Sequence, residues 1–205
     1  LRDGGIAMSL SSAPRDLEEG GLVALGPTGD VRWRCPLDAR VLSAPASQAK
    51  TLWVMVNEDR LVGLDVRTGR MTHSLDFDVA LGPSAPAVDG DTAYLPCQAP
   101  MLIAASLEGE IRWRFGVPGA LSGVWLDQTP WIGPRIVVTV ARQGTVFGIE
   151  RAGGTLAWES EVGPRGAALT APVGDAQRIY VGARDGVHAL QLEGGRPAWT
   201  FPTPS

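Results

Sequence analysis

The sequence predicts an all-β protein built from five consecutive copies of one four-stranded unit. Two observations carry this prediction. At five places along the 205 residues, a glycine is followed four residues later by a tryptophan, or once by a histidine. Short runs of β-prone residues, bounded by turn formers, recur with the same spacing. Self-similarity at a period of about forty residues indicates an array of equivalent supersecondary units.

The repeat is defined by these glycine and tryptophan positions. The second members of the pairs lie 40, 40, 45 and 41 residues apart (33 to 73, 73 to 113, 113 to 158 and 158 to 199). Histidine replaces tryptophan in the second copy. The five pairs are Gly29/Trp33, Gly69/His73, Gly109/Trp113, Gly154/Trp158 and Gly195/Trp199.

Each copy is expected to contain two short apolar strands before the repeat glycine. Both are short β-prone runs that are separated by Gly, Asp, Asn or Pro, as strands joined by tight turns require. The first strands are expected at 52–56, 92–96, 136–140 and 179–182, and the second strands at 22–25, 61–64, 102–105, 146–149 and 187–190.

The third strand follows the repeat glycine and carries the tryptophan. Glycine at the end of a tight turn suits a hairpin that needs a positive φ. Val31, Trp33 and Cys35 alternate with two arginines, which predicts one buried and one solvated face. Arginines on the free side also discourage edge-to-edge pairing. Each tryptophan is therefore expected to pack between neighbouring sheets.

A fourth strand is expected before the first in most copies. Its marker is a small residue followed by Ala-Pro, because proline fits a strand start where no ladder donor is needed. The triplet occurs at 43–45, 84–86 and 170–172, and the fourth copy has Ser122-Gly123-Val124 instead. Four short antiparallel strands repeated in tandem are the blades of a β-propeller.

The repeat template resembles that of the pyrroloquinoline-quinone (PQQ) type propellers. The template reads Leu-x-Ala-Leu-Asp-x-x-Thr-Gly-x-x-x-Trp, and its closest copy runs from Leu61 to Gly69. The other copies match at the Ala-Leu or analogous pair, the glycine and the tryptophan, so the resemblance extends from about Gly5 to Phe201. It implies a fold and no single activity, because function resides in sites grafted onto folds.

Two kinds of protein are implied by this resemblance. Quinoprotein dehydrogenases carry an adjacent Cys-Cys pair, a calcium ion held partly by Glu and Asn, and a catalytic Asp. This sequence has no Cys-Cys pair, and Asn57 is its only asparagine. The resemblance therefore favours the non-catalytic kind, which includes the lipoprotein scaffold of the outer-membrane protein insertion machine. We predict no catalytic, cofactor-binding or metal-binding residue and no cofactor, and we favour a periplasmic, envelope or extracellular location over the cytoplasm.

The expected domain is a single β-propeller, or a segment of one, over residues 1–205. Blades 1 to 5 are expected at about 1–38, 39–78, 79–118, 119–163 and 164–205. Two alternatives stay open: a closed five-bladed ring, or part of a larger ring with the seven or eight blades usual in the resembled family. The second alternative leaves two open faces that a partner subunit would cover.

Composition and charge limit the partners. A hydrophobic fraction of 44% and a charged fraction of 20% fit an ordinary globular protein. The net charge of −4 is too small to steer a polyanion, so nucleic acid is not an expected partner. No apolar run approaches the roughly 18 residues that span a bilayer. Cys35 and Cys97 either form a disulfide in an exported protein or, as burial statistics favour, are two buried thiols.

Candidate partner-binding residues lie where the repeat is interrupted. Blade 4 is longer than the others, and its extra stretch from Leu126 to Pro134 carries Trp131, with Trp125 just before it. Aromatic side chains on a loop are frequent interaction anchors, and the alternative is that they cap the blade. The long connection over 11–20 in blade 1 carries three acidic candidates, with a solvated loop as the alternative. These are Asp16, Glu18 and Glu19.

The two histidines are not expected to be catalytic. His73 takes the tryptophan position of blade 2 and is expected to face inward, and His188 falls in a second strand. Neither has a neighbouring carboxylate or serine placed by spacing for acid–base or nucleophilic work. The predicted function is therefore a non-enzymatic scaffold or accessory subunit that binds other protein subunits of a larger bacterial assembly. The alternatives are a relative of PQQ-dependent dehydrogenases and a ligand-sensing propeller.

Overall fold

The computed structural model describes residues 5–10, 20–37, 39–41, 43–119, 126, 128–164 and 169–203. These residues form nineteen strands and no helix. The strands make five separate antiparallel sheets that follow one another in sequence order. The predicted all-β architecture of consecutive propeller blades is confirmed.

Four of the five sheets have four strands each, and the sheet of blade 1 has three among the described residues. Blade 1 contains β1 (Ile6–Leu10), β2 (Gly20–Leu25) and β3 (Val31–Leu37). Blade 2 contains β4 (Ala46–Gln48), β5 (Thr51–Val56), β6 (Arg60–Asp65) and β7 (Met71–Asp76). Blade 3 contains β8 (Ala87–Asp89), β9 (Thr92–Pro96), β10 (Met101–Ser106) and β11 (Ile111–Gly116). Blade 4 contains β12 (Trp131–Ile132), β13 (Ile136–Ala141), β14 (Thr145–Glu150) and β15 (Leu156–Glu161). Blade 5 contains β16 (Val173–Gly174), β17 (Arg178–Ala183), β18 (Gly186–Gln191) and β19 (Pro197–Pro202).

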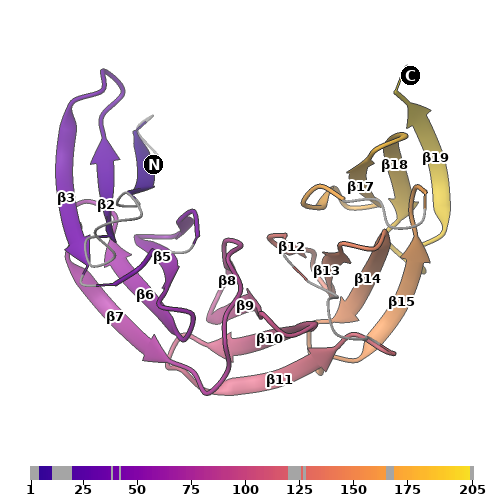
Figure 1. The fold of residues 1–205 in the computed structure, drawn as a ribbon, viewed down its shortest axis with the longest axis horizontal. Coiled ribbons are helices and arrows are strands. Elements are labelled where there is room, and N and C mark those ends of the chain that lie inside the picture. Colours follow the sequence, from indigo (N-terminus) through magenta and orange to yellow (C-terminus); the bar gives the residue numbers. More distant parts are fainter. Residues whose placement is uncertain are drawn as a thin grey trace.

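The five blades lie on an open arc (Figure 1). The last strand of each blade runs along the convex side, and short strands such as β8 and β12 lie on the concave side. Blade 1 and blade 5 form the two tips, which face each other across a wide opening. The described residues therefore do not form the closed five-bladed ring that the sequence left open as one alternative. Membership of a larger ring stays a prediction.

One register is repeated in every blade and positions the repeat tryptophan. On the last strand of each blade, the tryptophan or histidine pairs with a small residue on the neighbouring strand, and the register shifts by one residue directly beside that pair. Such a bulge re-aims the side chain next to it. The small residue leaves room for the large ring on the same face of the sheet. The five small residues are Ala24, Gly63, Ala104, Gly148 and Ala189.

The hydrophobic core is divided into four clusters, and each cluster lies between two neighbouring blades. One cluster joins blades 1 and 2, and another joins blades 2 and 3. The remaining two join blades 3 and 4 and blades 4 and 5. A sheet that is apolar on both faces must be covered on both faces. Each blade is therefore stabilised by its neighbours, as in other repeat architectures.

The prediction made from the marker triplets is confirmed, whereas the prediction for the insertion of blade 4 is wrong. The three small-Ala-Pro triplets end directly before β4, β8 and β16, as the prediction of a strand start requires. In blade 4 the expectation of a loop through Trp131 is wrong, because Trp131 and Ile132 form strand β12 and pair with Val138 and Val137. The alternative marker at 122–124 lies outside the described residues.

Candidate protein-interaction surface

The repeat tryptophans of blades 1, 3 and 4 each lock one blade onto the next. Their side chains are only 7 to 8% exposed. Each indole N–H donates to a backbone carbonyl of the following blade: Trp33 Nε1 to Val66 O at 3.1 Å, Trp113 Nε1 to Arg151 O at 2.9 Å and Trp158 Nε1 to Leu192 O at 2.9 Å. The expectation that these tryptophans pack between neighbouring sheets is thus confirmed for three blades. We call these three contacts the indole joints.

The repeat glycines form the receiving half of the indole joints. A Cβ atom added to Gly69, Gly154 or Gly195 would collide with the ring of the tryptophan in the preceding blade. All three glycines have a positive φ, of 69°, 70° and 65° respectively, which glycine adopts without steric cost. In blade 4 the Gly-x-x-x-Trp motif has both roles, because Gly154 receives the ring of Trp113 from blade 3 and Trp158 binds blade 5.

The joint between blades 2 and 3 is built differently. His73 takes the register position of the tryptophan, and its ring lies beside Trp53 on the face toward blade 3, as expected, although the residue is exposed. Trp53 on β5 is 1% exposed and lies 5.0 Å from the His73 ring. Leu75 occupies the position beside Gly109 that a tryptophan ring occupies at the other joints. The indole N–H of Trp53 is buried without a hydrogen-bond partner.

Arg151 reinforces the indole joint between blades 3 and 4. Its side chain contacts Asp89 Oδ2 at 2.6 Å, Tyr94 Oη at 3.0 Å and the carbonyl of Gly133 at 2.8 Å. The guanidinium carbon also lies 5.8 Å from the centre of the Tyr94 ring, within the range of a cation–π contact. The same residue thus holds blade 3 through its side chain and receives Trp113 through its backbone.

The apolar face of blade 5 that points away from blade 4 has no neighbouring sheet among the residues that the structure describes. Tyr180, Ala189 and Trp199 lie opposite one another in one register row, so their side chains share this face. Trp199 is 44% exposed, which corrects the expectation that it packs between blades. Three more apolar side chains of this face are exposed, and we call the whole face the terminal face of blade 5. They are Val173 (60%), Val187 (38%) and Phe201 (66%).

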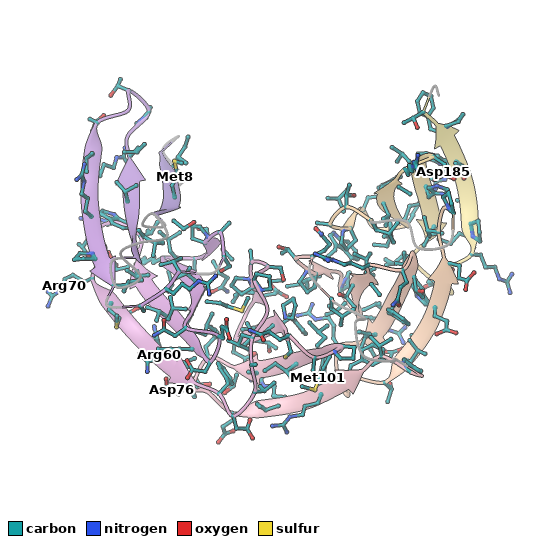
Figure 2. All side chains as sticks on the ribbon, viewed as in Figure 1. Met8, Arg60, Arg70, Asp76, Met101 and Asp185 are labelled. Carbon is teal, nitrogen blue, oxygen red and sulfur yellow. The ribbon has the colours of Figure 1, made fainter. Side chains whose placement is uncertain are left out.

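Blade 1 has a corresponding open face at the other tip of the arc. Ile6 and Met8 on β1 are 59% and 48% exposed. Figure 2 shows Met8 on the innermost strand at this tip and Asp185 at the opposite tip, while side chains fill the spaces between the sheets. Large exposed apolar patches on a globular protein mark interaction sites. The described apolar exposure is thus concentrated at the two ends of the arc.

Trp131 lies on the concave side of the arc and is half-buried. It belongs to β12, and its ring covers Gly133 and reaches Gly174 in blade 5. It packs against the cluster between blades 4 and 5. Part of the ring therefore has a structural role, while its accessible part remains the predicted partner contact. The other predicted partner contacts lie outside the described residues: Trp125, Asp16, Glu18 and Glu19.

His188 has two polar neighbours that sequence spacing did not reveal. Its Nε2 lies 2.9 Å from Asp185 Oδ1, and its Nδ1 lies 3.2 Å from Thr200 Oγ1. The hydrogen bond from His188 lowers the pKa of Asp185. The expectation that His188 has no neighbouring carboxylate is therefore wrong, because the hairpin brings Asp185 and the sheet brings Thr200 to its ring. The contacts tie the turn before β18 to strand β19, which is a structural role.

Two kinds of feature were sought in the part of the chain that the structure describes: a cluster of metal ligands and a membrane-spanning helix. That part contains no group of three or more His, Cys, Asp or Glu side chains arranged to hold a metal ion. None of its elements is a helix long and apolar enough to cross a membrane. Cys35 and Cys97 are free thiols. Burial raises the pKa of Cys97 to about 12, which makes this thiol a poor nucleophile.

The five blades and the indole joints between them define the class of protein. It is a β-propeller of PQQ-type repeats, whose blades are linked by tryptophan and glycine. Residues 3–200 match the family model described as "Outer membrane protein assembly factor BamB". The chain therefore belongs to the BamB family of PQQ-type propellers. It is 24% identical to the outer membrane protein assembly factor BamB of Yersinia pestis, over 98% of this chain and 53% of that protein.

Solved structures show the same fold. BamB from Moraxella catarrhalis superposes with a TM-score of 0.66 at 21% identity, covering 89% of this chain and 60% of that one. A quinohemoprotein alcohol dehydrogenase from Comamonas testosteroni gives a TM-score of 0.66 at 14% identity, covering 79% of this chain and 35% of that one. The chain thus spans about half the length of the curated relative it matches, and little more than half of the BamB structure.

Proposed function

We propose that this chain is a non-enzymatic propeller that binds other protein subunits in an outer-membrane protein assembly of the bacterial envelope. The observation that carries the proposal is the family match over residues 3–200, which is nearly the whole chain. The exposed apolar side chains at the two tips also support protein contacts. The same family match supports a location at the bacterial envelope, for which we propose the periplasmic side.

The partner contact is proposed on the concave side, at Trp131. This aromatic side chain is half-buried, and its ring packs against Gly133 and Gly174. Aromatic anchors of this kind dominate the binding energy of protein interfaces. Trp125 and the acidic residues Asp16, Glu18 and Glu19 remain proposed contacts of the same kind. Together they would supply two aromatic and three acidic contacts to a partner subunit.

The test is the affinity of the purified full chain for the purified other subunits of an outer-membrane protein assembly complex, measured by biolayer interferometry. Trp131→Ala is expected to weaken binding about tenfold or more, because a tenfold change corresponds to about 1.4 kcal/mol. Leu156→Ala is the matched control, since Leu156 is an exposed apolar residue on the outer strand of the same blade. Equal affinity of Trp131→Ala and wild type, with both folded by circular dichroism, would remove Trp131 from the interface.

A quinone-dependent activity is not favoured. The similarity to the quinohemoprotein dehydrogenase, at 14% identity, supports the fold alone. Titration of the full chain with PQQ and Ca²⁺ in a calorimeter is expected to give no saturable binding heat. Saturable binding with one quinone per chain would instead favour the dehydrogenase-related alternative.

A further inference from the structure

A hollow of about 300 Å³ lies between the end of blade 3 and blade 4. Residues 117–119, which follow the last strand of blade 3, form one wall. The other wall is the face of blade 4 that is turned toward blade 3, and it includes Phe147, a member of the apolar cluster between these two blades. Ligand pockets in proteins have volumes of about 300–1,000 Å³, so the hollow has room for one side chain of a partner. We call it the blade 4 hollow.

Two glutamates on β15 supply the charge of the blade 4 hollow. Glu159 lies opposite Phe147, and Glu161 lies opposite Thr145, in the register of β14 and β15. Both glutamates are therefore on the face that forms the hollow, and both are exposed. Neither carboxylate lies within 4.0 Å of a basic side chain in the part of the chain that the structure describes. The hollow thus combines an apolar wall with two unpaired negative charges.

In blade 2, the position of Glu161 binds a guanidinium from its own blade. Asp76 takes this position on the last strand, and Arg60 takes the position of Thr145 on the strand beside it. Arg60 Nε lies 2.5 Å from Asp76 Oδ1 (Figure 2). Blade 4 therefore has the carboxylate of this pair, but a threonine where the arginine of blade 2 stands.

In blade 3, a guanidinium takes the position of the other glutamate. Arg114 follows the repeat tryptophan of blade 3, as Glu159 follows that of blade 4. Arg114 Nη2 lies 3.0 Å from Oδ1 of Asp78, in the segment that leads from blade 2 to blade 3. Pro118 takes the position of Asp78 in the next blade, because each lies five residues after the repeat tryptophan or histidine. An arginine–carboxylate pair thus crosses the joint between blades 2 and 3, and its two positions at the next joint hold glutamate and proline.

We propose that the blade 4 hollow is a docking site for an arginine side chain of a partner protein. The two comparisons point to a guanidinium independently, because one pairs with a carboxylate at each of the two equivalent positions in blades 2 and 3. The guanidinium presents five N–H donors in one plane, which allows it to face Glu159 and Glu161 together. The apolar stem of the same side chain packs on Phe147. The proposal does not depend on the function proposed above or on the contact at Trp131.

A metal ion is a poorer occupant of the blade 4 hollow. Calcium takes six to eight oxygen ligands, several of them carboxylates. The described residues contain no group of three or more His, Cys, Asp or Glu side chains arranged to hold a metal ion. Charge complementarity and the apolar wall therefore favour an organic cation with an apolar stem, and arginine is the side chain that pairs at these positions elsewhere in the chain.

The test uses a blocked pentapeptide with one arginine between glycines, titrated into the isotope-labelled full chain at low salt and followed by NMR. The matched peptide carries citrulline, which has nearly the same shape without the charge. The arginine peptide is expected to shift the amide signals of residues 143–147 and 159–161 in a saturable way. The citrulline peptide is expected to bind at least about fivefold more weakly, a factor that corresponds to about 1 kcal/mol. Equal binding of the two peptides, or no saturable shift with arginine, would overturn the proposal.

Variants of the two glutamates locate the contact. Glu159→Gln and Glu161→Gln are each expected to weaken binding of the arginine peptide about threefold or more, and the double variant is expected to abolish it. Glu193→Gln is the matched control, since it removes one exposed carboxylate from blade 5 and leaves the hollow intact. Unchanged binding by the folded double variant would place the peptide elsewhere and overturn the proposal. Blocked arginine amide is the second probe. If it binds the hollow and the pentapeptide does not, the site takes a small cation, and the protein docking site is wrong.

Discussion

Trp158 and Trp199 occupy the same position in consecutive blades, yet only one of them is buried. Trp158 is 7% exposed and bonds to Leu192 O in blade 5. Trp199 is 44% exposed and lies on the terminal face of blade 5. Both follow the same register shift and face a small residue on the neighbouring strand. The comparison shows that each repeat supplies one half of an interface between blades. How much its tryptophan stabilises the fold depends on whether a neighbouring blade supplies the other half.

The largest expected effect is the difference between removing the two rings. Trp158→Ala is expected to lower the free energy of unfolding by about 3–5 kcal/mol, because it leaves a cavity between two blades. Trp199→Ala is expected to cost less than about 1 kcal/mol, since much of the ring is already in water. Urea denaturation followed by circular dichroism measures both. Similar losses for the two variants would show that the blade 4 and 5 interface does not depend on the indole joint.

A second comparison concerns the receiving glycines. Gly154→Ala is expected to cost about 2–4 kcal/mol, because alanine is strained at a φ of 70° and its Cβ collides with Trp113. Gly29→Ala is expected to cost about 1 kcal/mol, since its φ of 86° is also strained but no atom lies within 4 Å of the added Cβ. Thermal and urea unfolding of both variants test this. A cost for Gly29→Ala as large as that for Gly154→Ala would mean that backbone strain alone determines both effects.

The predictable part of this molecule was the part that repeats. Period-2 alternation and turn residues at a constant spacing identify strands, and five copies of one pattern identify blades. Positive φ at the repeat glycines follows from their place at the end of a tight turn, and all five glycines show it. Local sequence carries these features because they depend on a few adjacent residues.

The joints were harder to predict, because they pair residues from different blades. Trp33 contacts Gly69, and no spacing within one copy reveals that contact. The use of Trp53 beside His73 depends on the register between β5, β6 and β7, which the sequence pattern does not specify. The strand at Trp131 was missed because a two-residue strand carries almost no alternation signal. The contact of His188 with Asp185 and Thr200 required both the hairpin and the sheet to be known.

The smallest expected effect on stability comes from an ion pair within one blade, in contrast to the joints between blades. Arg112 Nη2 lies 2.5 Å from Asp91 Oδ2 within blade 3, and both side chains are largely exposed. Exposed ion pairs contribute little to stability, because water and salt screen them and both side chains lose freedom. Asp91→Asn is therefore expected to shift the urea midpoint at pH 7 far less than Trp158→Ala does.

The pH dependence of that small effect has a definite sign. The hydrogen bond from Arg112 lowers the pKa of Asp91 to about 2 in the folded protein, against about 3.9 for an unperturbed Asp. A carboxyl with a depressed folded-state pKa stabilises the fold above its unfolded pKa, and this contribution is lost as the pH falls through the folded value. The difference between wild type and Asp91→Asn should thus be constant above about pH 5 and should shrink between about pH 4 and pH 2. Urea midpoints at pH 7, 5, 3 and 2 measure it, and a difference that grows on acidification would contradict the ion pair. A shift at pH 7 as large as that of Trp158→Ala would mean that the contacts within a blade matter as much as the joints between blades.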